Sequence, residues 1–352
     1  MSTHDVRHMV FGVMFAGALS VLGQVASGGQ QSTGVPTPAA GQAQGRGGTP
    51  EAARPDNADS LAHLAAARTI VADDPWLRLP YEFYCVAGNA RGNNAQAPQL
   101  EPVKIFDNLY AIGHTETTVY AITTPEGIIL LDSGYADRVQ TVIVAALRQL
   151  DLDPDDVKYI LLGHGHGDHL GGSSYFQERH GTRVGTTVED WDVIWPPGAD
   201  PAREGQARPR RDLVLAEGTP VTLGDTTVTV VHIPGHTPGG LAFIFPVRDG
   251  GQTHMAGLFG GTILTTNRIS TPGLKQYVES IGHFVDIARQ MKVDVEIQNH
   301  PIFDGMRDRL AMLETRTANA PHPFVVGAER YAKFWNVIST CIQAEIARRG
   351  DD

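Results

Sequence analysis

A ten-residue segment rich in glycine and histidine constrains this chain more than any other feature. Residues 163–172 read Gly-His-Gly-His-Gly-Asp-His-Leu-Gly-Gly and directly follow the apolar run 157–162, which has the length and β-branched bias of a buried strand. The interleaved glycines let the backbone turn tightly enough for neighbouring side chains to converge. The segment predicts a metal site suited to zinc, and it offers three imidazoles and one carboxylate: His164, His166, Asp168 and His169.

Two later histidines extend this set. His236 follows the strand-like run 227–233, and His300 follows the run 293–297, so each lies at the end of an expected strand. Four ligands so close in the sequence cannot all bind one tetrahedral ion, which indicates further ligands and a second metal. A polar loop with incidental histidines would explain one isolated histidine, but it is disfavoured for a cluster of this density.

With these residues the chain resembles the metallo-β-lactamase superfamily over about residues 106–304. The family motif His-x-His-x-Asp-His stands here at 164–169. The resemblance implies an α/β (α+β) fold, a four-layer αβ/βα sandwich, that binds two zinc ions per chain. It implies two ligand sets, one for each ion: His164, His166 and His236 for the first zinc, and Asp168, His169 and His300 for the second.

Asp132 ends the expected strand 128–131 and matches a family aspartate that lies behind the metals. An aspartate that simply begins a turn is an equally good interpretation of this position.

The segment 256–262 separates the subclasses of the family. Many of its hydrolases, including glyoxalase-type thioesterases and lactonases, bridge the two metals with an aspartate here, and two β-lactamase subclasses use a cysteine. This chain has neither residue in the segment, so it resembles class B β-lactamases of the third subclass. That resemblance implies a zinc-dependent hydrolase in which a metal-bound hydroxide, oriented by Asp168, opens the β-lactam amide.

Two alternatives remain open. The third subclass often carries a serine-containing segment where Gly260-Gly261-Thr262 stands here, which leaves room for an exported metallo-hydrolase of another ester, lactone or thioester. A metal-binding scaffold without catalysis is the other alternative, and the complete set of six ligands disfavours it.

Residues outside the ligand sets are also expected at the cleft. An aromatic stretch at 73–86 is typical of a core or a wall, and the corresponding segment borders the cleft in the resembling enzymes. The segment 191–211 is long enough to be a loop with a function, covering the cleft. Possible substrate contacts from these stretches and from the segment after 259 are Trp76, Tyr81, Trp191, Trp195, Gly261 and Thr262.

The chain is expected to have three parts. Residues 1–27 resemble a secretory signal peptide, with an apolar run too short and too rich in glycine for stable membrane insertion. Residues 28–56 have the composition of a flexible low-complexity linker. Residues 57–352 form the hydrolase domain, which is expected to be periplasmic or secreted after signal cleavage.

Composition limits the partners. With 41% apolar residues the chain can build a large core, and a formal net charge of −11 argues against a nucleic-acid partner, which needs clustered Lys and Arg. We expect a small-molecule substrate, and the sequence leaves the oligomeric state open. Cys85 and Cys341 are the only cysteines. Export permits a disulfide, but the apolar context of each favours buried free thiols.

The remaining periodicities predict two sheets packed face to face, with helices outside. A first antiparallel group of strands is expected at 104–106, 109–112, 118–123 and 128–131, and a second group at 221–233, 241–247 and 254–259. Helices are expected at 58–72, 139–150, 274–291, 306–319 and 328–348.

Overall fold

The computed structural model describes residues 54–87, 97–199, 208–264, 269–317 and 320–350. The expected signal peptide at 1–27 and most of the expected linker at 28–56 lie outside these residues. The last linker residues are already tied to the domain: Arg54 donates a hydrogen bond to the carbonyl of Arg349, and Asp56 accepts one from Arg348 at 2.7 Å.

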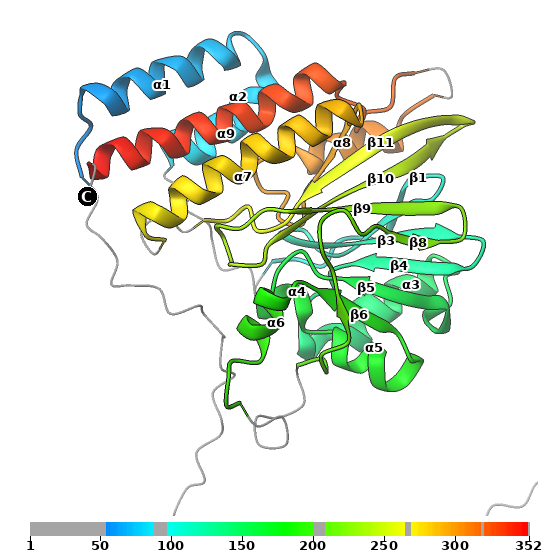
Figure 1. The fold of residues 1–352 in the computed structure, drawn as a ribbon. Helices are drawn as coiled ribbons and strands as arrows, with labels where there is room; N and C mark the ends of the chain where they lie inside the picture. The colour runs from blue at the N-terminus through cyan, green and yellow to red at the C-terminus, as the bar shows by residue number, and fades with distance from the viewer. Residues whose placement is uncertain (1–53, 88–96, 200–207, 265–268, 318–319, 351–352) are drawn as a thin grey trace, which may run out of the picture. The chain divides into compact units, whose positions relative to one another are not determined.

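Two β-sheets form the centre of the domain, as expected (Figure 1). The larger sheet is antiparallel across its first four strands and parallel from the fourth strand onward. Its order is β1 (Val103–Phe106), β2 (Leu109–His114), β3 (Thr117–Thr124), β4 (Gly127–Leu131), β5 (Val157–Leu161), β6 (Arg183–Thr186) and β7 (Leu213–Val214). The smaller sheet has the order β12 (Val295–Ile297), β11 (Gln252–Phe259), β10 (Leu241–Asp249), β9 (Thr226–His232) and β8 (Val221–Leu223).

Continuous apolar runs mark strands that are buried on both faces. In β4, Ile129 and Leu131 pack between the two sheets, whereas Ile128 and Leu130 face the outer helices. Successive side chains of a strand point to opposite faces, so one run of apolar residues supplies both cores. Phe243 and Phe245 of β10, in the opposite sheet, belong to the same central core.

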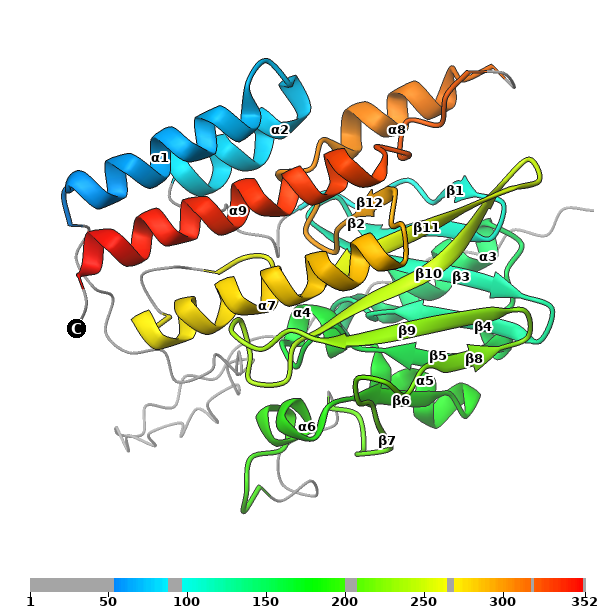
Figure 2. The ribbon, with the colours of Figure 1, turned by 45° about the horizontal axis from the view of Figure 1, so that its top comes forward.

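Helices cover both outer faces, which confirms the four-layer αβ/βα sandwich (Figures 1 and 2). The smaller sheet is covered by α1 (Ala58–Val71), α2 (Pro75–Tyr81), α7 (Thr271–Gln290) and α9 (Ala328–Arg349). The larger sheet is covered by the helical stretch Val139–Val144, α3 (Ala145–Gln149), α5 (Ser173–His180) and α6 (Val188–Ile194). Two further helices flank the sheet ends, α4 (Gly167–Leu170) and α8 (Met306–Glu314).

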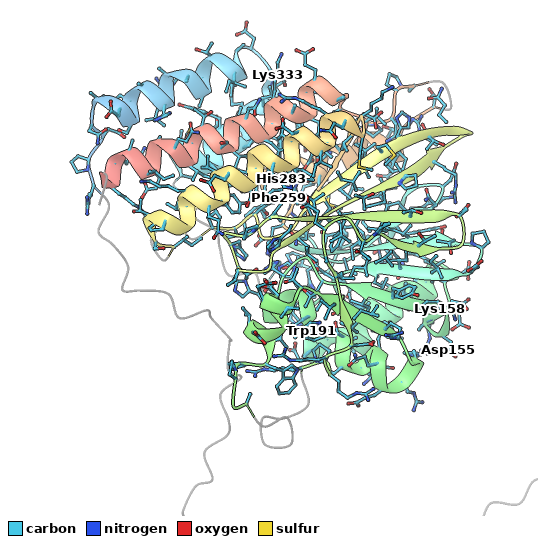
Figure 3. All side chains as sticks on the ribbon, in the orientation of Figure 1. Asp155, Lys158, Trp191, Phe259, His283 and Lys333 are labelled. Atoms are coloured by element: carbon cyan, nitrogen blue, oxygen red, sulfur yellow. A yellow bond between two sulfur atoms is a disulfide. The ribbon has the colours of Figure 1, made fainter. Side chains whose placement is uncertain are left out.

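An aromatic cluster holds α7 and α9 on the smaller sheet. Phe259 at the end of β11 lies beneath these helices (Figure 3), with its ring centroid 4.6 Å from that of Trp335 and 5.2 Å from that of Phe284. No helix in the described ranges is sufficiently long and apolar to cross a membrane.

The prediction of free cysteines is wrong, because Cys85 and Cys341 form a disulfide. Helix α1 runs beside α9, and α2 turns back along it, so residues 256 positions apart in sequence have Cα atoms only 4.9 Å apart. Trp76 of α2 also links α2 to α9 and to the segment before α8. Its ring stacks on Phe334 at 4.8 Å, and its Nε1 donates to the carbonyl of Asp304 at 2.7 Å.

The expected long loop at 191–211 begins later than predicted. Trp191 lies within α6 (Figure 3) and is only 1% exposed, with its Nε1 donating to the carbonyl of Leu213. Trp195 is also buried and donates to the carbonyl of Pro209. Both indoles pack against the larger sheet and supply core contacts, while residues 200–207 lie outside the described ranges.

Candidate metal centre

All six expected ligands follow strands of the two sheets. The loop after β5 carries His164 and His166, and α4 carries Asp168 and His169. His236 follows β9 and His300 follows β12, and both of these strands belong to the smaller sheet. The structure brings these side chains together in two groups, and within each group the potential ligand atoms all lie within 4.8 Å of one another. The groups are the two expected sets: His164, His166 and His236, and Asp168, His169 and His300.

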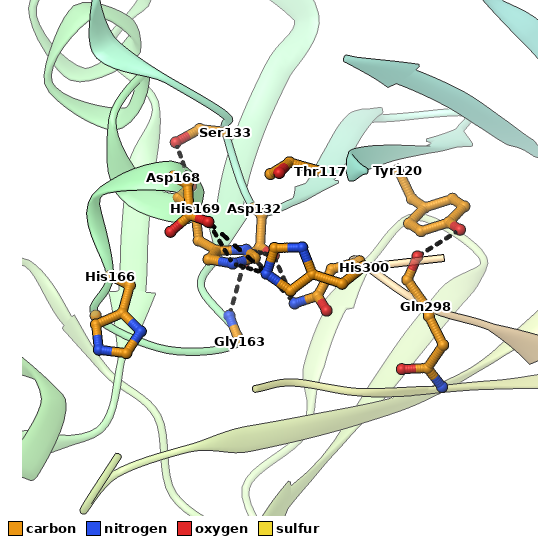
Figure 4. Close-up of polar contacts among 12 residues, drawn as sticks. Thr117, Tyr120, Asp132, Ser133, Gly163, His166, Asp168, His169, Gln298 and His300 are labelled. Carbon is orange, nitrogen blue, oxygen red and sulfur yellow. Dashed lines mark hydrogen bonds and ion pairs between the residues drawn. The ribbon is translucent and has the colours of Figure 1, made fainter. Parts of the chain in front are cut away.

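Hydrogen bonds fix the tautomers in the second group (Figure 4). His169 Nδ1 lies 2.7 Å from the Asp132 carboxylate, and His300 Nδ1 lies 2.6 Å from the carbonyl of Glu116. Both oxygens can only accept, so each Nδ1 carries a hydrogen, and in the neutral ring each Nε2 then presents a lone pair. These two Nε2 atoms face each other at 3.0 Å. Two lone pairs at this distance repel unless they share a cation, so this group fits a metal ion.

Asp168 completes the second group with a negative charge. One of its carboxylate oxygens lies 3.7 Å from the Nε2 atoms of both His169 and His300. The Asp168 side chain is 18% exposed, whereas the His169 side chain is fully buried, so Asp168 lies on the solvent side of the group.

The first group consists of three imidazoles. His236 Nε2 and His166 Nδ1 face each other at 3.0 Å, and the rings of His164 and His236 have centroids 4.5 Å apart. Burial, reinforced by the neighbouring imidazoles, holds the pKa values of His164 and His236 well below the usual range. Both rings are therefore neutral at neutral pH, which is the form that binds metals. Among the described residues, the buried Nδ1 atoms of these two rings have no hydrogen-bond partner.

Asp132 lies behind the second group and accepts three hydrogen bonds. They come from His169 Nδ1 at 2.7 Å, the backbone of Gly163 at 2.8 Å and the Asn299 side chain at 3.1 Å. Asp132 is 2% exposed and has a φ of 64°, a left-handed conformation that Asp tolerates better than most residues. These contacts favour the interpretation that Asp132 lies behind the metals and orients His169 over the interpretation that it simply begins a turn.

Two supports of the second group were not expected from the sequence. Asn299 joins His300 to Asp132, and the backbone carbonyl of Glu116 orients the His300 ring. The position of Asn299 directly before a candidate ligand was the available signal. A backbone carbonyl leaves no signal in a sequence.

The segment Gly260-Gly261-Thr262 is packed against the first group rather than open to a substrate. Gly261 has a φ of +74°, and an added Cβ there would lie 2.6 to 2.8 Å from ring and Cβ atoms of His236. Thr262 is fully buried, and its carbonyl accepts a hydrogen bond from Tyr84 at 2.6 Å. The Thr262 side chain does not reach the surface, and its contact with a substrate stays a prediction.

The expected aromatic contacts also lie in packed positions. Trp76, Trp191 and Trp195 are buried in the two outer cores, so they do not present a face to a substrate. Tyr81 is partly exposed on α2, where its hydroxyl accepts a hydrogen bond from Arg68 Nε at 2.7 Å. The partly exposed ligands are His166, Asp168 and His236, and they mark the side from which solvent reaches the centre.

Comparison with known proteins agrees with this geometry. Residues 112–250 match the metallo-β-lactamase superfamily. BJP-1, a subclass B3 metallo-β-lactamase of Bradyrhizobium japonicum, is 29% identical, with a TM-score of 0.61 over 73% of this chain and 97% of BJP-1. The FEZ-1 metallo-β-lactamase of Legionella gormanii shares the fold at 23% identity, with a TM-score of 0.60 over 73% of this chain and 99% of FEZ-1.

Curated sequence relatives have a different name. A hydroxyacylglutathione hydrolase of Cupriavidus metallidurans is 30% identical over 161 residues, which is 45% of this chain and 52% of that enzyme. One of Cereibacter sphaeroides is 40% identical over 86 residues, which is 24% of this chain and 28% of that enzyme. The chain thus spans about half or less of the length of these relatives.

Proposed function

We propose that this chain, whose residues 112–250 form a metallo-β-lactamase superfamily domain, is a zinc-dependent hydrolase that opens the β-lactam amide. The observation that carries the proposal is the pair of complete three-ligand groups, which share no carboxylate or thiolate among the described residues. Imidazole and carboxylate donors in groups of three suit zinc and leave a position for water. We therefore propose two zinc ions per chain.

Zinc in such a site lowers the pKa of water towards about 7 and polarises a carbonyl, so no serine or cysteine nucleophile is needed. The protein supplies the positions of the groups around the reaction. We propose that Asp168, which lies on the solvent side of the second group, orients the attacking water. His169 and His300 are held in fixed tautomers by Asp132 and by the Glu116 carbonyl, so their lone pairs stay directed at the centre.

Two observations favour a β-lactam over a thioester. The structural match to BJP-1, a subclass B3 metallo-β-lactamase, covers 97% of that enzyme, and the sequence matches to the two hydroxyacylglutathione hydrolases cover 28% and 52% of theirs. The segment 256–262, in which thioesterases of the family carry a bridging aspartate, has no acidic residue here, and its Gly260 and Gly261 pack against Gly163 and His236. The second candidate function is hydrolysis of a glutathione thioester, and the names of the curated relatives favour it.

We also propose that the protein is exported to the periplasm or secreted. The Cys85–Cys341 disulfide supports this proposal, because such bonds persist in oxidising compartments.

A substrate panel tests the function. We expect the zinc-loaded protein to hydrolyse a chromogenic cephalosporin and a carbapenem, and a chelator to abolish this turnover. His166→Ala, which removes one ligand of the first group, is the control and should be inactive. Turnover of an acyl-homoserine lactone or a glutathione thioester, without chelator-sensitive β-lactam turnover, would reject the β-lactamase proposal.

A further inference from the structure

We propose that Asp190 is a positioning residue for the first metal group and sets the metal affinity of that group independently of the second. The inference rests on the proposed metal centre, but not on the identity of the substrate. Asp190 lies in the first turn of α6, outside both ligand groups, and it is fully buried.

The Asp190 carboxylate joins the two chain segments that carry the first group. Oδ2 accepts a hydrogen bond from the backbone N–H of Gly165 at 2.8 Å, and Gly165 stands between His164 and His166. The same oxygen accepts from the Thr237 hydroxyl at 2.9 Å, and Oδ1 accepts from the backbone N–H of Gly239 at 2.9 Å. Thr237 directly follows His236. One side chain therefore fixes the spacing between the β5 loop and the β9 loop.

Glycines allow this close approach. An added Cβ at Gly165 would lie 3.1 Å from Ile194 and 3.2 Å from the carbonyl of Asp190, and one at Gly239 would lie 2.6 Å from the backbone nitrogen of Asp190. Larger residues at either position would push α6 away from the loops. Gly165 thus serves two purposes, since it permits the tight turn between His164 and His166 and the contact with Asp190.

All three partners donate, so both Asp190 oxygens must accept. Burial raises the pKa of Asp190, and the hydrogen bonds from Thr237, Gly239 and Gly165 oppose that rise. A buried carboxylate with three donors strongly fixes the groups that it binds. Asparagine has nearly the same shape, but its NH₂ group would face one of these donors and leave it unpaired.

The arrangement mirrors that of Asp132 on the second group. Asp132 binds Gly163, His169 and Asn299, next to His300, whereas Asp190 binds residues beside the three histidines of the first group. Each ligand group therefore has its own buried carboxylate. The sequence Thr187-Val-Glu-Asp190 has the spacing of a helix-capping motif, so from the sequence Asp190 is read as a capping residue rather than as a support of the first metal group. Only the Thr187 half of the cap forms, with the Thr187 hydroxyl accepting from the Asp190 backbone at 3.2 Å.

Zinc affinity measured one group at a time tests the proposal. The first group is isolated in a His300→Ala background and the second in a His236→Ala background, and each zinc Kd is measured by competition with a chelator. We expect Asp190→Asn to weaken zinc binding by the first group about 10–100-fold. Binding by the second group should change less than about twofold. Asp132→Asn is the matched control and should show the opposite pattern.

Thr237→Val removes one of the three donors and keeps the test valid if Asp190→Asn does not fold. We expect a smaller loss of zinc affinity, again confined to the first group. Equal losses at both groups, or unchanged affinity of the first group, would overturn the proposal. No substrate enters these measurements, so a failed substrate panel would reject the proposed function and leave this result standing.

Discussion

Replacement of Arg309 by methionine is expected to lower the free energy of unfolding by about 3–5 kcal/mol, because it leaves buried carboxylates without their positive partner. Arg309 of α8 donates to the Glu296 carboxylate at 2.8 Å and lies 2.9 Å from the Asp304 carboxylate. The Arg309 side chain is 7% exposed, and both acidic side chains are fully buried. Because these side chains are buried, water cannot solvate the carboxylates that the substitution leaves without a positive partner.

This cluster also braces the segment that carries His300. Arg309 donates a second bond to the backbone carbonyl of Glu296 at 2.8 Å, and the Gln298 side chain donates to the Glu296 carboxylate at 2.8 Å. The Tyr120 hydroxyl binds the carbonyl of Gln298 at 2.9 Å (Figure 4). Loss of Arg309 is thus expected to loosen the end of β12 and weaken the second metal group as well as the fold.

The destabilisation should depend on pH. Burial raises the pKa values of Glu296 and Asp304, and removal of the Arg309 charge raises them further. Between about pH 4, where the carboxyl groups of the unfolded chain titrate, and the raised pKa values of the folded state, the folded variant holds protons that the unfolded chain has released. Its stability therefore falls as pH increases through this range, which extends at least to the pKa of about 8 that Glu296 has beside Arg309. We expect a smaller loss of stability at about pH 5 than at about pH 8.

Denaturant unfolding of the oxidised protein measures this effect. The double variant Glu296→Gln/Arg309→Met is the control, and it should be more stable than Arg309→Met alone because one unpaired charge is gone. A loss below about 1 kcal/mol for Arg309→Met, or a loss that grows as pH falls, would contradict the account.

Replacement of Gly261 by alanine is expected to damage the first metal group more than the fold. The left-handed backbone at Gly261 costs a non-glycine residue about 1–2 kcal/mol. The added Cβ would also press on His236, with ring atoms at 2.6 and 2.7 Å, so the ring must move. Displacement of a reacting geometry by about 1 Å costs about 100-fold in rate, and we expect hydrolysis to fall by at least that factor.

Gly181 provides a control that separates the cost of backbone strain from the effect of contact with His236. Gly181 has a φ of +69°, close to that of Gly261, but an added Cβ there meets no atom within 4 Å. Gly181→Ala should therefore lose a similar amount of stability and keep its zinc and its turnover. Equal turnover in the two variants would show that Gly261 does not support His236.

The six candidate ligands could be predicted because their signals are local. They follow β5 of the larger sheet and β9 and β12 of the smaller sheet, three strands whose apolar patterns are clear, and the structure brings the segments after these strands together. The sequence 164–169 contains four of the ligands without any long-range contact. The sheets and the long helices were predictable for the same reason, since burial on one or two faces gives each element its own period.

The remaining features depend on contacts between distant segments. Trp76 and Cys85 became core residues only because α1 and α2 fold back along α9, and no local pattern gives that position. Trp191 and Asp190 share one short helix, and burial of both depends on how α6 meets β6 and the metal loop. Gly261 has no side chain whose chemistry could be interpreted from the sequence. The structure shows that a Cβ at this position would collide with His236.

The number of zinc ions per chain tests the central claim most directly. Elemental analysis of the zinc-saturated, purified protein should give two zinc ions per chain, and His300→Ala should give one, because this substitution removes a ligand from the second group alone. One zinc ion in the unaltered protein at saturation, or two in His300→Ala, would contradict the account of two separate metal groups.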